Sequence, residues 1–115
     1  MSTRICLLVY LALFIDLPLA AAPTGQQLLQ ACERALTDGY RGLDASMCEW
    51  YVTPCDCDVT KQKEQRPRVC LPANVSGKLL ARKVIKGIRS EPGLSGKSAA
   101  YAAAVVLSRS YPCPD

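Results

Sequence analysis

Apolar residues recur at helical spacing in four stretches of the chain beyond residue 23, and no stretch alternates for long enough to be a strand. The first predicted helix opens at Thr24, which forms a capping box with Gln27, and stops at Gly39. A second, short helix is predicted from Ser46, again through a capping box, and Pro54 ends it. The pattern therefore predicts an all-α domain.

The third predicted helix begins after Pro72, takes its cap from Asn74 or Ser76, and runs to about Ser90. Its apolar face consists of Leu80, Ala81, Val84, Ile85 and Ile88. A cationic stripe lies on the opposite side: Lys78, Arg82, Lys86 and Arg89. Solvated cations around a buried core explain most of this pattern. Leu79 is the exception, because it lies on the cationic side and is expected to be exposed.

The fourth predicted helix, from about Lys97 to Ser110, is apolar on all sides over residues 99–107. A helix of this kind is normally covered on every side by other parts of the protein. A four-helix domain of this size has too few other helices to cover one helix completely. We therefore expect a partner or a second copy to cover residues 99–107, which makes a homodimer a prediction. The alternative is that alanines in this stretch are tolerated at the surface.

The start of the chain has the anatomy of a secretory signal. Arg4 precedes an unbroken apolar run over residues 5–14, and the small residues 20–22 offer a cleavage site. The run is shorter than the ~20 residues of a membrane span, so an uncleaved anchor is the weaker alternative. We predict a signal peptide over residues 1–22 and a mature helical domain over 23–115, exported and free of the membrane once the signal is removed.

Export changes how the seven cysteines are interpreted, because Cys6 leaves with the signal and an even number remains. The third and fourth helices are joined by a Pro-Gly turn and should pack antiparallel. That packing brings Cys70, before the third helix, close to Cys113, after the fourth. By similar reasoning Cys32 in the first helix should meet Cys48 in the second, so two intramolecular disulfides are predicted.

Cys55 and Cys57 remain, separated by one residue in a polar connection. The pair could join to itself in a strained ring, bridge to another chain or stay reduced. A third structural disulfide is one interpretation, and because strained bridges are more reducible, a redox role is another. Redox proteins of the thioredoxin type set Cys-x-x-Cys in a βαβ framework, which this sequence lacks, so a structural role is favoured.

The residue types on which catalysis depends are scarce. The chain has no histidine, which excludes Ser-His and Cys-His catalysis and the usual zinc sites. No phosphate-binding glycine loop is present, so we predict neither an enzyme nor a cofactor. The charge balance, 14 Lys and Arg against 10 Asp and Glu, favours acidic partners only weakly and gives no reason to expect nucleic acid.

The spacing of cysteines, prolines and apolar residues resembles that of the periplasmic immunity proteins of bacterial type VI secretion, the Rap/Tai group that neutralises peptidoglycan amidases. The resemblance rests on 69–72 (VCLP), Val75, Leu79 and Leu80, Pro92, 98–100 (SAA), Leu107 and 111–113 (YPC). Upstream, the spacings Leu28-Leu29-x-x-Cys32 and Cys48-x-x-Tyr51 resemble the first helix and the Cys-x-Gly-Tyr element of the group. The chain departs from the group at Trp50, where glycine is usual, and at residues 54–57.

The resemblance implies a periplasmic, all-α inhibitor with intramolecular disulfides that blocks the catalytic cleft of a secreted amidase, and it implies frequent dimers. Exposed residues that a folded core does not require are the candidate contacts: Lys61, Lys63, Arg66, Arg68, Lys78, Leu79 and Arg82.

Two other function classes stay open at this stage. Small helical carriers of apolar ligands also combine disulfides with a Cys-x-Cys element, although they usually add an adjacent Cys-Cys that is missing here. The second alternative is a thiol-redox protein that uses Cys55 and Cys57.

Overall fold

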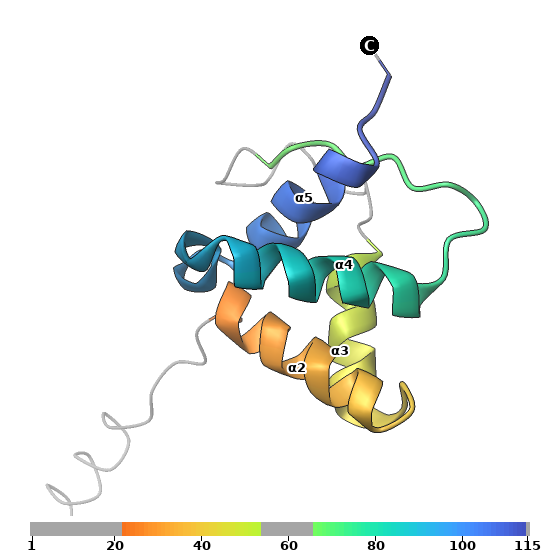
Figure 1. Cartoon of the computed structure of the whole chain (residues 1–115), viewed down its shortest axis with the longest axis vertical. Coiled ribbons are helices and arrows are strands. Elements are labelled where there is room, and N and C mark those ends of the chain that lie inside the picture. The colour runs from red at the N-terminus through yellow and green to blue at the C-terminus, as the bar shows by residue number, and fades with distance from the viewer. Residues whose placement is uncertain (1–21, 54–65, 115) are drawn as a thin grey trace, which may run out of the picture.

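The computed structural model describes residues 22–53 and 66–114, and within them the chain forms four α-helices and one 3-10 helix (Figure 1). In chain order these are α2 (Gly25–Thr37), α3 (Gly42–Val52), α4 (Gly77–Ser90), η2 (Pro92–Gly96) and α5 (Ala99–Ser110). The part described holds no strand, only two isolated β-bridges, so the predicted all-α class is confirmed. The predicted signal up to residue 21, the Cys55–Cys57 pair, Lys61 and Lys63 lie outside the described residues.

Helix α2 begins as the sequence predicts. The Thr24 hydroxyl accepts a hydrogen bond from the Gln27 backbone N–H, and the Gln27 side chain accepts one from the Thr24 backbone N–H at 2.9 Å. Gly39 follows the helix with φ +76°, a conformation that favours glycine at a helix end. The helix contacts every other helix of the described residues, namely α3, α4, α5 and η2.

The N-cap of helix α3 is Arg41, five residues before Ser46, which the capping-box pattern indicates as N-cap. The helix starts at Gly42, and Ser46 lies inside it with its hydroxyl donating to the Gly42 carbonyl oxygen at 3.2 Å. The Glu49 carboxylate, expected to close the box, instead accepts a hydrogen bond from the Tyr40 hydroxyl. The predicted start at Ser46 is therefore wrong, because a tertiary partner takes the acidic side chain on which the box depends.

Helices α4 and α5 lie side by side in opposite directions, as the sequence predicts. A Cβ atom added at Gly87 would lie 2.4 Å from Val106 Cγ1, and Lys83 Nζ lies 3.5 Å from Ser110 Oγ, so later residues of α4 face earlier residues of α5. The Ser76 hydroxyl caps α4 and the Ser98 hydroxyl caps α5. In Figure 1, α4 crosses the molecule with α5 on one side and α2 on the other.

Two disulfides connect segments that are far apart in sequence. Cys70 and Cys113 join the entry of α4 to the exit of α5, and Cys32 joins α2 to Cys48 of α3. These are the two pairs expected from the helix arrangement. The first spans 43 residues and the second 16, so each closes a loop in the unfolded chain and reduces its conformational entropy.

The burial of α5 removes the reason for which a covering partner was expected. Over residues 99–107 every side chain is buried or half-buried within one copy of the chain. The buried members are Ala99, Ala102, Ala103, Ala104, Val106 and Leu107. Small alanine side chains let α5 pack closely against α2, α3 and α4, so a single domain covers a helix that is apolar on all sides. The homodimer stays a prediction without this support.

The predicted core face of α4 is confirmed, since all five of its apolar residues are buried. No helix in the part of the chain described here is both long enough and apolar enough to cross a membrane.

Candidate partner-binding surface

The solvent side of α4 is strongly basic. The helix carries five cations and no acidic residue, and four of the cations are exposed: Lys78, Arg82, Lys86 and Arg89. The fifth, Lys83, lies over the Tyr111 ring at 5.5 Å from its centroid. Leu79 is 42% exposed among these cations, as the sequence predicts. The outer face of α4 therefore presents an apolar side chain within a field of positive charge.

A groove of about 540 Å³ runs between α2 and α4. The residues that line it are Glu33, Leu36, Thr37, Arg82, Ile85, Lys86, Arg89 and Ser90. Leu36 is half-buried and Ile85 is 7% exposed, so both belong to the edge of the core and supply apolar surface. The remaining lining is polar or charged: the α4 wall is basic, and the α2 wall carries Glu33 and Thr37.

The charges of the groove are only partly balanced. Arg89 forms an ion pair with Glu33 across the two helices at 3.0 Å. Within the described ranges 22–53 and 66–114, Arg82 and Lys86 have no carboxylate within ion-pair distance. Three cations and one carboxylate line the groove, so its net charge is positive and favours an anionic ligand.

The candidate contacts predicted from the sequence do not form one cluster. Lys78, Leu79 and Arg82 share the outer face of α4. Arg68 lines a different hollow, of about 390 Å³, at the C-terminal end of α5, with Ser108, Pro112, Cys113 and Pro114. Arg66 is half-buried and already interacts within the chain. The α4 residues are thus the part of the predicted set that forms a continuous surface.

Helix α3 bears an exposed apolar ridge that sequence reasoning missed. Leu43 is 89% exposed, Trp50 is 77% exposed, and Met47 between them is half-buried. Their spacing of four and three residues places them on one helix face. The residues Ala45, Cys48 and Val52 face the core on the other side. The sequence alone indicates such a ridge: apolar residues lie on two opposite sides of α3 and leave it no continuous polar face.

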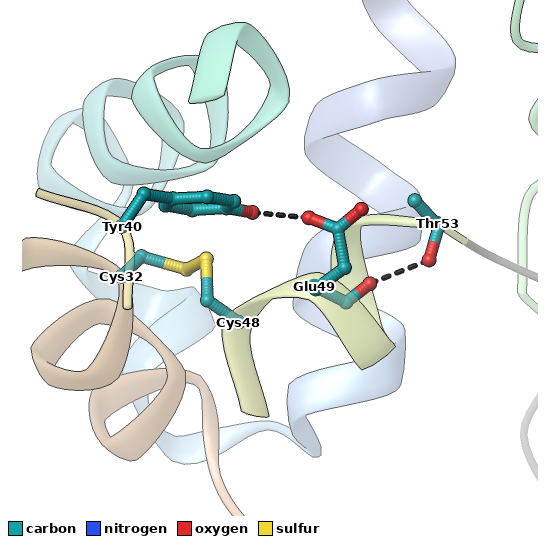
Figure 2. The surroundings of a disulfide bond; sticks show 5 residues. All are labelled: Cys32, Tyr40, Cys48, Glu49 and Thr53. Atoms are coloured by element: carbon teal, nitrogen blue, oxygen red, sulfur yellow. Dashed lines mark hydrogen bonds between the residues drawn. A yellow bond between two sulfur atoms is a disulfide. The ribbon is translucent and has the colours of Figure 1, made fainter. Parts of the chain in front are cut away.

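The orientation of this ridge is fixed by contacts on the inner side of α3. Figure 2 shows the Cys32–Cys48 disulfide beside the hydrogen bond from Tyr40 to Glu49. Burial and the hydrogen bond to the Glu49 carboxylate raise the pKa of Tyr40 above its usual range. A Cβ atom at Gly77 would lie 2.9 Å from the Tyr40 hydroxyl oxygen, so the start of α4 lies directly against this pair.

A family model, described as Rap1a immunity proteins, matches residues 24–113. The match covers all four α-helices and both disulfides. The chain belongs to the Rap1a immunity protein family. The comparisons with curated proteins and with solved structures gave no match.

Membership in this family favours an immunity protein over the two other function classes, the apolar-ligand carrier and the thiol-redox protein. An immunity protein binds a secreted effector and acts as its inhibitor. Two disulfides in so short a chain indicate an oxidising compartment, so this immunity protein is exported. Both hollows described above open at the surface beside charged side chains, whereas a carrier of apolar ligands needs an enclosed, mostly apolar cavity. The pair on which a thiol-redox role depends, Cys55 and Cys57, lies outside the described residues.

Proposed function

We propose that this immunity protein acts in the periplasm, where it binds a type VI secretion peptidoglycan amidase and covers its catalytic cleft. The amidase as target comes from the sequence resemblance. The observation that carries the proposal is the outer face of α4, where Lys78, Leu79 and Arg82 are exposed together on a helix without acidic residues. A folded core does not require this surface, and an acidic partner is the simplest reason for it.

Inhibition by covering a cleft places a physical demand on the inhibitor. The contact surface must keep its shape when it is pressed against the effector, because ordering it on binding would cost affinity. Helix α4 meets this demand: the Cys70–Cys113 disulfide closes its entry, and five of its side chains are buried. No reaction is needed, since occlusion by a rigid surface excludes the substrate.

Periplasmic co-expression with a candidate amidase tests the proposal. The wild-type chain is expected to protect cells from lysis, and a variant with Lys78→Glu and Arg82→Glu is expected to lose protection while it remains folded. Lys97→Glu reverses an exposed cation that lies outside α4 and serves as the control, expected to protect fully. Full protection by the α4 variant would refute this surface, and no protection by the wild type against any exported amidase would refute the target class.

The homodimer through residues 99–107 has its own test. Light scattering or sedimentation at micromolar concentration gives the mass in solution, and a strict monomer would remove the dimer from the proposal.

A further inference from the structure

The groove between α2 and α4 holds two cations, Arg82 and Lys86, that pair with no carboxylate of residues 22–53 and 66–114. Arg82 and Lys86 are one helical turn apart on α4, so their Cβ atoms are about 6 Å from each other. Both are exposed, and the carboxylates that pair with neighbouring cations do not reach them. Glu33 pairs with Arg89, and Glu91 pairs with Arg109 at 2.5 Å. Two adjacent cations on one wall are suited to two carboxylates or to one doubly charged group.

The base of the groove adds an apolar component. Leu36 and Ile85 lie between the two helices, and each is packed against the core while one side borders the groove. A ligand that filled the groove would cover this apolar surface as well as meet the cations. An inorganic anion would use only the charges, so the lining fits a ligand with both kinds of group.

The dimensions fit a short stretch of polypeptide. The lining residues of α4 run from Arg82 to Ser90, which is about 12 Å of helix axis at 1.5 Å per residue. An extended chain covers that length in about four residues at 3.3 Å per residue. The Glu33–Arg89 ion pair lies in the same groove and leaves Arg82 and Lys86 as the cations available to a ligand.

We propose that this groove binds an acidic segment of the effector, about four residues long, in which carboxylates flank an apolar side chain. The carboxylates pair with Arg82 and Lys86, and the apolar side chain lies on Leu36 and Ile85. The inference rests on the proposed immunity function for the source of the segment. It adds a second helix, α2, to the contact surface. It also makes Lys86 and Thr37 contact residues, and neither was among the candidate contacts predicted from the sequence.

A designed peptide tests the groove without the effector. The probe is acetyl-Glu-Glu-Leu-Glu-Glu-amide, titrated into the disulfide-bonded, ¹⁵N-labelled protein purified from the periplasm. Chemical-shift changes are expected at residues 33–37 and 82–90 and should disappear in high salt, where exposed charge pairs are screened. The same peptide with lysine at each glutamate is the matched control and should cause no shift there.

Three single substitutions separate the groove from general attraction between opposite charges. Lys86→Glu is expected to weaken the affinity for the peptide about threefold to tenfold, as reversal of one exposed charge partner allows. Lys97→Glu changes the net charge equally but lies outside the groove, so it should leave the affinity within about twofold. Thr37→Arg adds a cation to the exposed wall of α2, where a cation also suits the helix C-terminus, and is expected to tighten binding.

Each contrary result overturns the inference. No binding, shifts elsewhere on the surface, or equal effects of Lys86→Glu and Lys97→Glu would each show that the groove does not select the acidic segment. Shifts at the same residues that appear with rising protein concentration, without peptide, would place a second copy there instead. Once a cognate effector is identified, its affinity for the wild type and for Lys86→Glu can be compared. Equal affinities would refute the groove as the binding site and leave the immunity function intact. If the wild type binds the peptide in the groove but binds no amidase effector, the proposed target is refuted and the groove stands.

Discussion

The close approach of α4 and α5 at Gly87 and Val106 gives a prediction with a definite sign. A Cβ atom at position 87 would lie 2.4 Å from Val106 Cγ1, 2.5 Å from Cγ2 and 3.0 Å from Cβ. These distances are well below van der Waals contact, and the β-branched valine is stiff at χ1. Gly87→Ala must therefore push the two helices apart or force Val106 from its preferred rotamer.

The size of the effect follows from two opposing contributions. Replacing glycine by alanine inside a helix stabilises it by about 1 kcal/mol, whereas overpacking a well-filled core costs about 1–3 kcal/mol. We expect Gly87→Ala to lower the free energy of unfolding by about 1 kcal/mol, the difference between a mid-range cost and that gain. Val106 is 6% exposed, so Val106→Ala alone should cost about 2 kcal/mol for two methyl groups and the space they leave.

The double variant decides whether this reasoning is right. With the valine methyl groups gone, the alanine at position 87 fills vacated space and should stabilise the protein by about 1 kcal/mol relative to Val106→Ala. The predicted coupling is then about 2 kcal/mol, within the range found for residues in contact. Urea unfolding followed by circular dichroism measures all four proteins.

A second double-mutant cycle controls for the effect that a glycine-to-alanine substitution has on stability at any position. Gly93 lies in η2 with open space around its Cβ position, so Gly93→Ala combined with Val106→Ala should be additive. If the Gly87–Val106 cycle is additive as well, within about 0.5 kcal/mol, the packing of α4 on α5 described here is wrong.

Three further predictions concern other parts of the fold. Removing the longer disulfide by Cys70→Ala with Cys113→Ala should lower the free energy of unfolding by about 4 kcal/mol in the chain-entropy model, against about 3 kcal/mol for the shorter one; equal losses in urea unfolding would contradict this order. The pKa of Tyr40 is raised in the folded state, so its stabilising contribution is complete below the unfolded pKa of about 10 and declines as pH rises through the folded pKa. The difference in urea midpoint between wild type and Tyr40→Phe should shrink above pH 10 and stay constant from pH 7 to 9. Trp50→Ser removes an exposed side chain, so stability should change by no more than about 0.5 kcal/mol, and a larger loss would show that the ridge is packed.

The helices could be predicted where local signals and tertiary contacts agree. The capping box at Thr24 forms as expected, and the core face of α4 follows its 3.6-residue period because that face is buried along its whole length. Helix α3 shows the opposite case. The local pattern at Ser46 competes with the Tyr40–Glu49 hydrogen bond, and a contact between residues nine apart does not appear in a local pattern.

The candidate site was predictable only in part, for a related reason. One helix wheel is enough to place Lys78, Leu79 and Arg82 on the outer face of α4. The groove depends on where α2 lies, because Leu36 and Thr37 join Arg82 and Lys86 only after two helices pack together. The exposed ridge on α3 could have been found from its spacing, but apolar residues on both faces of a helix do not show which face is inward.

Backbone hydrogen bonds and a disulfide tie both ends of the described domain to distant parts of the chain, and this affects how fast exopeptidases can degrade it. At the start, Ala99 N–H donates to the Pro23 carbonyl oxygen at 2.9 Å, and Gly25 N–H donates to the Lys97 carbonyl oxygen at 2.8 Å. At the other end, Cys70 N–H donates to the Tyr111 carbonyl oxygen at 3.0 Å, beside the disulfide to Cys113. An exopeptidase that degrades the domain from either end meets a segment already bound to a distant part of the chain, so trimming must wait for rare opening events. The domain is therefore expected to resist exopeptidases for longer than one whose ends are free.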